Sequence, residues 1–167
     1  MPRRFDLQEF LPYLLNRAGM RIGVMFSHDV APYGVTLPMW RVLLELWNAA
    51  DHRLGDLAER TTIDLSTLSR LIVSMQRQRL VTRRRSGSDG RALSLTLTAK
   101  GTTLVETIAP FAIYYEKLAM KGLTSSEIAE LKRLLRRVFA NLDHASKEKA
   151  AAGKSARRRA RVVNRKR

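Results

Sequence analysis

Apolar residues near the start of the chain recur every three or four positions, which is the pattern of a long amphipathic helix. Asp6 is expected to cap this helix, with Glu9 in the position of a capping box, and the helix should end before Pro32. The apolar stripe consists of Leu7, Phe10, Leu11, Leu14, Leu15, Ala18, Ile22, Met25 and Phe26.

The same period returns after Thr98 and continues, beyond a break at Gly122, to Leu142. Thr124 and Glu127 have the spacing of a capping box at the start of the last helix. The apolar stripes of the first helix and of these last two helices are longer than the core of one small domain can cover. The surplus indicates a partner, most simply a second copy of the same chain.

Three shorter helical patterns lie between these long segments. Thr36 can cap the first, and residues 39–47 are apolar nearly all round, which places this helix at the centre of the fold. The second, residues 56–60, is short, and the third begins after Asp64, which is a suitable cap.

The helix after Asp64 has two chemically different faces. Its buried stripe is expected to be Leu68, Leu71, Ile72 and Met75. The opposite face carries Ser66, Thr67, Ser69, Arg70, Ser74 and Arg77. Small hydroxyl residues let a helix approach the major groove, and Arg bonds guanine with two hydrogen bonds. The face indicates DNA binding, although an ordinary solvated helix face has the same residue types.

Residues 81–85 and 92–97 alternate as two strands around a turn-rich tip, which predicts a β-hairpin. Its arms carry Arg83, Arg84, Arg85 and Arg91. Such a hairpin, placed just after a short helix pair, is suited to enter a minor groove as a wing. The alternative is a solvated hairpin without function, which four arginines in nine residues make less favourable.

The net charge of the chain indicates which class of partner it binds. The 167 residues carry a formal net charge of +16 and a pI near 11.3, so we expect a polyanion, either nucleic acid or an anionic membrane surface. Residues 147–167 hold ten Lys and Arg against one Glu. With two valines as their only sizeable apolar residues, they are expected to be disordered in isolation, either as a solvated tail or as an arm contacting phosphates.

Several function classes are excluded or disfavoured. The chain has no cysteine, so disulfide scaffolds, thiolate metal sites and thiol redox sensing are impossible. Its three histidines lack metal-ligand spacing, and no nucleophile with a nearby base or Gly-rich phosphate loop is evident. We expect no enzyme, metal or cofactor. Without an apolar run of membrane length or a secretory signal, a cytoplasmic protein is expected.

Taken together, several motifs resemble the multiple-antibiotic-resistance regulator (MarR) family of bacterial transcription factors. These are Leu57-Ala58-Glu59-Arg60, the Asp64-Leu-Ser-Thr-Leu-Ser-Arg-Leu helix, Leu80-Val81-Thr82-Arg83, Asp89-Gly90-Arg91 and Leu95-Thr96-Leu97-Thr98-Ala99-Lys100-Gly101. The resemblance covers residues 7–142 and leaves the basic tail outside.

The resemblance implies a mainly α, α+β fold: a winged helix-turn-helix DNA-binding lobe (residues 35–98) and a long-helix dimerisation region (residues 1–34 and 99–146), followed by the tail (residues 147–167). The recognition helix would be residues 65–78 and the wing residues 81–97. Arg91 would reach the minor groove while Asp89 holds the wing tip. Arg79 departs from the family, which usually has Gly there, and could contact a phosphate.

Because a homodimer has two-fold symmetry, we expect it to bind a pseudo-palindromic operator in double-stranded DNA, with half-sites roughly 10 bp apart. Arg70 is the first candidate for base readout, followed by Ser66, Thr67 and Ser69. The other expected DNA contacts are Ser74, Arg77, Arg83, Arg84, Arg85, Ser88, Asp89 and Arg91.

The resemblance also implies a small aromatic or carboxylate-bearing effector that binds between the dimerisation helices and the DNA-binding lobe. Candidate effector residues are Arg21, Met25, Phe26, His28, Trp40 and Trp47, although aromatic residues at helical spacing are more often core. The expected function is a sequence-specific regulator, a repressor released by its effector, bound to the bacterial nucleoid. The alternative is a DNA-coating protein driven by charge with little sequence preference.

Overall fold

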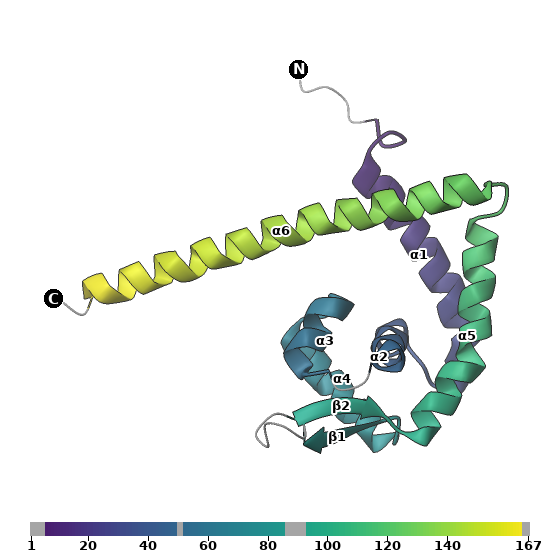
Figure 1. Ribbon diagram of the computed structural model, residues 1–167, viewed down its shortest axis with the longest axis horizontal. Helices are drawn as coiled ribbons and strands as arrows, with labels where there is room; N and C mark the ends of the chain where they lie inside the picture. The colour runs from purple at the N-terminus through teal and green to yellow at the C-terminus, as the bar shows by residue number, and fades with distance from the viewer. Residues whose placement is uncertain (1–5, 50–51, 86–92, 165–167) are drawn as a thin grey trace. The chain divides into compact units, whose positions relative to one another are not determined.

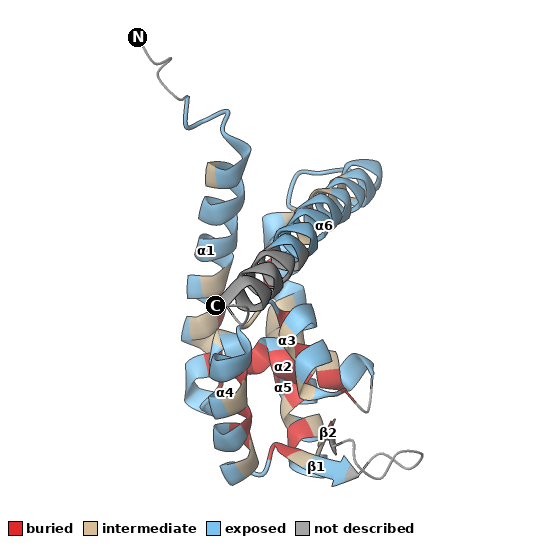
Figure 2. Cartoon of the chain, turned by 90° about the vertical axis from the view of Figure 1, so that its left-hand side faces the viewer, coloured by how far each residue is buried: buried red, intermediate tan, exposed pale blue. Residues whose placement is uncertain are grey.

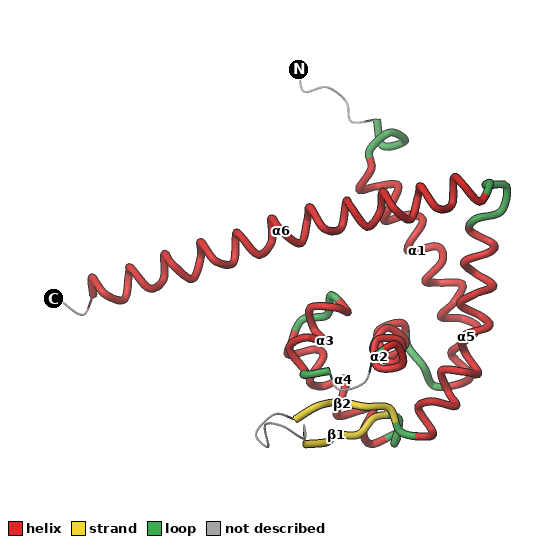
Figure 3. Tube along the Cα trace, in the orientation of Figure 1, coloured by secondary structure: helices red, strands yellow, loops and turns green. Residues whose placement is uncertain are grey.

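A computed structural model describes residues 6–49, 52–85 and 93–164 of the chain, which divides into two compact units, residues 1–119 and 120–167 (Figure 1). The first unit contains five α-helices, one short 3-10 helix and a two-stranded antiparallel sheet in its described part. These are α1 (Leu11–Val30), η1 (Ala31–Tyr33), α2 (Leu37–Asn48), α3 (Leu54–Thr61), α4 (Leu65–Arg77), β1 (Val81–Arg85), β2 (Leu93–Leu97) and α5 (Ala99–Ala119). The second unit contains α6 (Ser125–Asn164). Figure 3 shows the predominance of helix, which confirms the expected mainly α fold class.

The start of α1 differs from the prediction. Asp6 does not cap the helix: its Oδ1 accepts a hydrogen bond from the Gln8 N–H (2.9 Å) in a turn that precedes α1. The N-cap is Phe10, which makes no side-chain cap hydrogen bond, and Pro12 lies in the first turn. Proline starts a helix well because its φ is already helical and its missing N–H would have no partner there.

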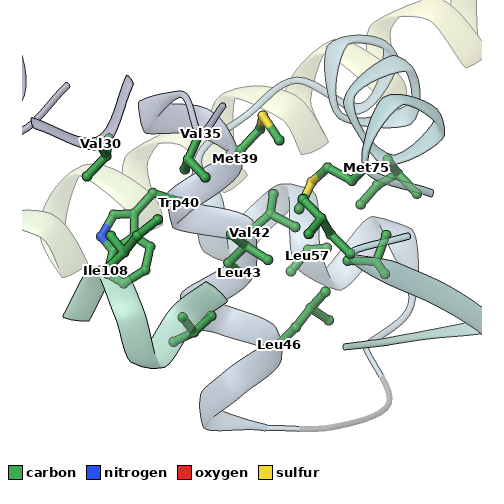
Figure 4. Close-up of a cluster of buried hydrophobic side chains, with 14 of the residues drawn as sticks. Val30, Val35, Met39, Trp40, Val42, Leu43, Leu46, Leu57, Met75 and Ile108 are labelled. Carbon is green, nitrogen blue, oxygen red and sulfur yellow. The ribbon is translucent and has the colours of Figure 1, made fainter. Parts of the chain in front are cut away.

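The core of the first unit forms around α2, as its apolar pattern predicts. Thr36 is the N-cap, and its hydroxyl accepts a hydrogen bond from the Met39 N–H (3.4 Å). Figure 2 shows that buried residues lie on several elements, and Figure 4 shows their side chains meeting at this helix. The most completely buried large residues are Val30, Val42, Leu43, Leu57, Leu68, Ile72, Met75, Leu80, Val105 and Ile108.

Helices α1 and α5 are joined by a hydrogen bond and by aromatic packing. The Tyr115 hydroxyl donates to Asp29 Oδ2 (2.6 Å), and the ring of Tyr115 meets that of Phe26 edge-on. The hydrogen bond to the carboxylate, with burial, raises the pKa of Tyr115 to about 12. The same bond, with a smaller contribution from His28, lowers the pKa of Asp29 below its ordinary value.

In the second unit, the predicted capping box opens α6. The Thr124 N–H donates to Glu127 Oε2 (2.7 Å), and the Glu127 N–H donates to the Thr124 hydroxyl (3.3 Å). These hydrogen bonds lower the pKa of Glu127. Within the ranges that the structure describes, no helix is long and apolar enough to cross a membrane.

The basic tail differs from the prediction of disorder, because α6 continues without interruption to Asn164. Its sequence, rich in Ala, Lys and Arg, explains the difference: these residues have the highest helix propensities, so a helix can extend without burying apolar surface. The last three tail residues lie outside the described part of the chain.

Candidate nucleic-acid interface

Helices α3 and α4 form a pair joined by a tight turn. Thr62, the C-cap of α3, has a left-handed backbone conformation (φ 56°), which reverses the chain between the two helices. Leu57 of α3 and Leu68 of α4 are both completely buried in the common core. The packing fixes which side of α4 remains available to a ligand.

Asp64 begins α4 as predicted. Its Oδ1 accepts hydrogen bonds from the Thr67 N–H (2.9 Å) and from the Ser66 hydroxyl (2.7 Å). The hydroxyl bond is the largest cause of a pKa for Asp64 far below its usual range. Ser66, a predicted DNA contact, therefore uses its hydroxyl proton within the cap and keeps its lone pairs for an incoming donor.

The two faces of α4 are separated as its sequence predicts, with Leu68, Ile72 and Met75 buried and Leu71 partly buried. Of the predicted contacts, Ser69 is half-buried and five are exposed: Ser66, Thr67, Arg70, Ser74 and Arg77. The Ser74 hydroxyl accepts a hydrogen bond from Gln78 Nε2 (3.4 Å). The structure thus gathers the predicted residues of α4 on one accessible surface.

The hairpin has the expected antiparallel register, in which Arg83 pairs with Leu95 and Arg84 with Ser94. Leu95 also forms a bridge with His52, whose carbonyl accepts the Leu95 N–H (2.9 Å). This bridge, which the sequence pattern did not predict, ties the base of the hairpin to the segment before α3.

Arg83 and Arg84 are exposed on β1. Arg85 lies in β1, but its side chain is outside the described part, as are Ser88, Asp89 and Arg91 at the tip. Their predicted roles therefore remain predictions.

Some exposed cations outside this surface form ion pairs. Arg60 lies 3.7 Å from Glu45, and Arg133 is bonded to Glu130 (2.6 Å). Among the residues that the structure describes, no ion pair is found for the cations of the α4 and β1 surface, Arg70, Arg77, Arg83 and Arg84. Their charge is available to phosphates or base edges.

The exit from α4 is closed by backbone hydrogen bonds. The Arg79 N–H donates to the Gln76 carbonyl and the Leu80 N–H to the Met75 carbonyl, both at 2.9 Å, which is the Schellman arrangement. Arg79 occupies its left-handed position with φ 59°. Gly usually fills this position because any Cβ is strained there.

Residues at the start of α5 hold this exit. The Thr98 hydroxyl donates to the Arg79 carbonyl (2.5 Å), the Thr98 N–H donates to the Leu80 carbonyl (3.1 Å), and Lys100 Nζ donates to the Gln78 carbonyl (3.1 Å). Gly101 passes so close that a Cβ there would overlap the Leu80 carbonyl oxygen. The sequence pattern did not predict these roles, although all three residues belong to the motif Leu95–Gly101.

The predicted effector residues do not form a single site. Phe26 and Trp40 are buried in the core with ring centroids 5.6 Å apart, so the core alternative holds for both. His28 is 88% exposed and lies beside Asp29, while Trp47 is exposed on α2. Met25, also exposed, lies on α1.

Two cavities instead lie along α1. One, of about 560 Å³, is lined by Arg21 together with Leu14, Arg17, Ala18, Met20 and Val24. The other, of about 580 Å³, lies between α1 and the start of α2 and is lined by Leu15, Asn16, Gly19, Met20, Gly23, Val24, Ser27, Leu37 and Arg41. Sequence periodicity missed Arg41 because it considers only the apolar residues of this helix.

Known proteins share this architecture. The HTH-type transcriptional regulator MgrA of Staphylococcus aureus is 29% identical over 151 residues, covering 89% of this chain and all of MgrA. The solved structure of the repressor CouR bound to a 23-mer DNA duplex matches with a TM-score of 0.70 and 28% identity, over 80% of this chain and 94% of that chain. BpsR of Bordetella bronchiseptica, whose DNA binding is regulated by 6-hydroxynicotinic acid, matches with a TM-score of 0.71 and 28% identity, over 80% and 96%.

The family resemblance rests on both sequence and fold. A sequence model described as MarR family matches residues 33–92, from just before α2 to just before β2. The structural matches extend beyond this segment to about four-fifths of the chain. The order of elements, the α3–α4 pair and the hairpin agree with this match. Residues 33–92 are thus similar to the MarR family, and most of the chain is similar in sequence and fold to known transcriptional regulators.

Proposed function

We propose that the protein is a homodimeric, sequence-specific DNA-binding transcriptional regulator that represses by occupying its operator. The observation that carries this proposal is the exposed face of α4, where hydroxyl residues and arginines without an ion pair among the described residues lie opposite the stripe of Leu68, Ile72 and Met75, which is buried. The structural similarity to CouR bound to duplex DNA supports the same use of the surface.

Within this surface, Arg70 is the residue proposed to read bases. It is exposed in the second turn of α4, between Thr67 and Ser74, where a guanidinium can reach guanine in the major groove. Arg83 and Arg84 of β1 would add phosphate contacts that carry affinity but little sequence information.

Dimerisation is proposed from uncovered apolar residues on the long helices. α1 exposes Leu11, Leu14, Leu15, Met20, Ile22 and Val24, and α6 exposes Leu134, Leu135, Phe139 and Leu142. Solvent contact of so many large apolar side chains is unfavourable, so a second copy is the simplest cover. Two recognition helices would then read half-sites roughly 10 bp apart.

An effector is proposed for the cavity between α1 and α2. Met20, Val24 and Leu37 give it apolar walls, and Arg41 supplies a cation for a carboxylate. The regulation of BpsR by 6-hydroxynicotinic acid supports an aromatic acid as the effector class. Binding there would favour a dimer conformation with lower operator affinity, which relieves repression.

The test is selection of sequences from a random duplex pool at physiological salt, with Arg70→Ala as the comparison. We expect an enriched inverted repeat whose enrichment is lost or relaxed at specific base positions in the variant. Equal affinity for every duplex, unchanged by Arg70→Ala, would contradict sequence-specific regulation.

That contradicting outcome would favour the second candidate, a DNA-coating protein. The observation behind it is the extension of α6 to Asn164, through a stretch (residues 147–164) that carries seven Lys and Arg against one Glu. A steep salt dependence without sequence preference is its signature, and removal of residues 147–167 would abolish most of that dependence.

A further inference from the structure

Arg79 occupies a backbone conformation that is unfavourable for arginine. Its φ is 59°, and the other non-glycine residue with positive φ in the described chain is Thr62 at the end of α3. A Cβ in this region crowds the following carbonyl, so Gly would be more stable at the same position. A strained residue that persists despite a simple stabilising alternative is a reason to look for a functional role.

The geometry of the helix exit does not depend on the side chain at position 79. The Schellman hydrogen bonds use the main-chain N–H groups of Arg79 and Leu80. Thr98 and Lys100 bind main-chain carbonyls of Gln78, Arg79 and Leu80. Since all these partners are backbone atoms, Gly at position 79 would keep the exit and remove the strain.

The side chain of Arg79 is exposed and cationic. Among the residues that the structure describes, no hydrogen bond or ion pair of its guanidinium is found. In the chain it lies between Arg77, on the last turn of α4, and the exposed Arg83 and Arg84 of β1. Exposed arginines thus lie on both sides of Arg79 in the sequence, on the proposed recognition helix and on the hairpin.

We propose that Arg79 binds a backbone phosphate of duplex DNA where the recognition helix ends, and that the protein tolerates backbone strain to place a guanidinium there. This inference rests on the proposed DNA-binding function and adds a residue to its interface. A guanidinium can bind a phosphate with two parallel hydrogen bonds, which Gly cannot replace. DNA binding and fold stability should therefore respond to Arg79→Gly with opposite signs.

The experiment measures thermal unfolding and binding to a fixed duplex between 50 and 200 mM salt for the wild-type protein, Arg79→Gly and Arg79→Ala. We expect Arg79→Gly to raise Tm by about 3 °C, since it relieves one left-handed residue. Both variants should bind about tenfold more weakly at 50 mM salt. Their log–log salt slopes should be smaller by about 1.8, because a dimer loses two phosphate contacts.

Two further variants serve as matched controls. Arg137→Ala removes one charge from α6, on the side of the helix away from its apolar stripe, and should leave the salt slope unchanged. Arg79→Lys keeps the charge and should preserve the slope.

An unchanged slope in Arg79→Gly, or an equal reduction in Arg137→Ala, would overturn the proposal. A loss confined to Arg79→Gly and absent in Arg79→Ala would overturn it as well, because the cause would then be conformational. These outcomes differ from failure of the proposed function, in which the wild-type protein itself binds no duplex or shows no sequence preference.

Discussion

Most large apolar residues of the α2–α3–α4 lobe are buried, whereas many of those on the long helices α1 and α6 are exposed. Leu43, Leu57 and Leu68 of the lobe are completely buried. The large apolar residues of α1 and α6 named above are 37% to 65% exposed. The lobe buries these residues in a core that it shares with α1 and α5, whereas the named residues of α1 and α6 are exposed in the single chain. Folding of the lobe and the proposed assembly of the long helices should therefore respond to different substitutions.

The largest expected effect is loss of a core residue in the lobe. Leu68→Ala removes a completely buried side chain between α4 and α3, so the free energy of unfolding should fall by about 3 kcal/mol. Chemical denaturation should show this loss at every protein concentration. A loss that depends on concentration would mean that the lobe owes its stability to a partner.

The next effect concerns the contact between α5 and the exit of α4. Gly101→Ala places a methyl group against the Leu80 carbonyl oxygen, so backbone must shift at an overpacked site. We expect the free energy of unfolding to fall by about 2 kcal/mol. Gly55→Ala is the matched control, since a Cβ at Gly55, an exposed residue of α3, meets nothing within 4 Å. If Gly101→Ala and Gly55→Ala change the free energy of unfolding equally, the close approach of Gly101 to the Leu80 carbonyl is not the cause of the loss.

Assembly should respond to a change on the surface of α6. Phe139 is 56% exposed, so Phe139→Ser should leave the fold of a single chain intact and weaken the proposed homodimer about tenfold or more. Sedimentation velocity over a range of concentrations measures the change. If the wild-type protein sediments as a monomer at every concentration, the exposed face of α6 does not form a homodimer.

The smallest effect is the pH dependence of the link between α1 and α5. Because the folded pKa of Tyr115 is raised from 10.0 to about 12, its contribution is present below pH 10 and is lost between pH 10 and 12. Because the pKa of Asp29 is lowered, its contribution is present above the ordinary carboxyl pKa and is lost as pH falls through the lowered value. Thermal unfolding of Tyr115→Phe should lack the alkaline loss. An identical pH profile for variant and wild type would show that the bond adds nothing.

Local sequence rules correctly predicted three helix caps and the two faces of α4. Asp64, Thr36 and Thr124 cap their helices, and the stripe of α4 is buried, because caps and periodicity depend on neighbouring residues alone. Asp6 failed as a cap because the competing start at Pro12 lies on the same short segment. The tail differed from the prediction of disorder because that prediction considered only the burial of apolar surface. It left out the intrinsic helix propensity of the tail residues.

The sequence by itself determined the order of helices, the two faces of α4, the charge of the chain and the motifs that resemble the MarR family. Only the tertiary structure decided that Phe26 and Trp40 fill the core and that Arg41 lines a cavity. It also decided that Thr98 and Lys100 hold the exit of α4 from about twenty residues away in sequence. The physical reason is that caps and stripes arise from contacts within a few residues, whereas burial, cavities and carbonyl partners depend on segments that meet only when the chain has folded.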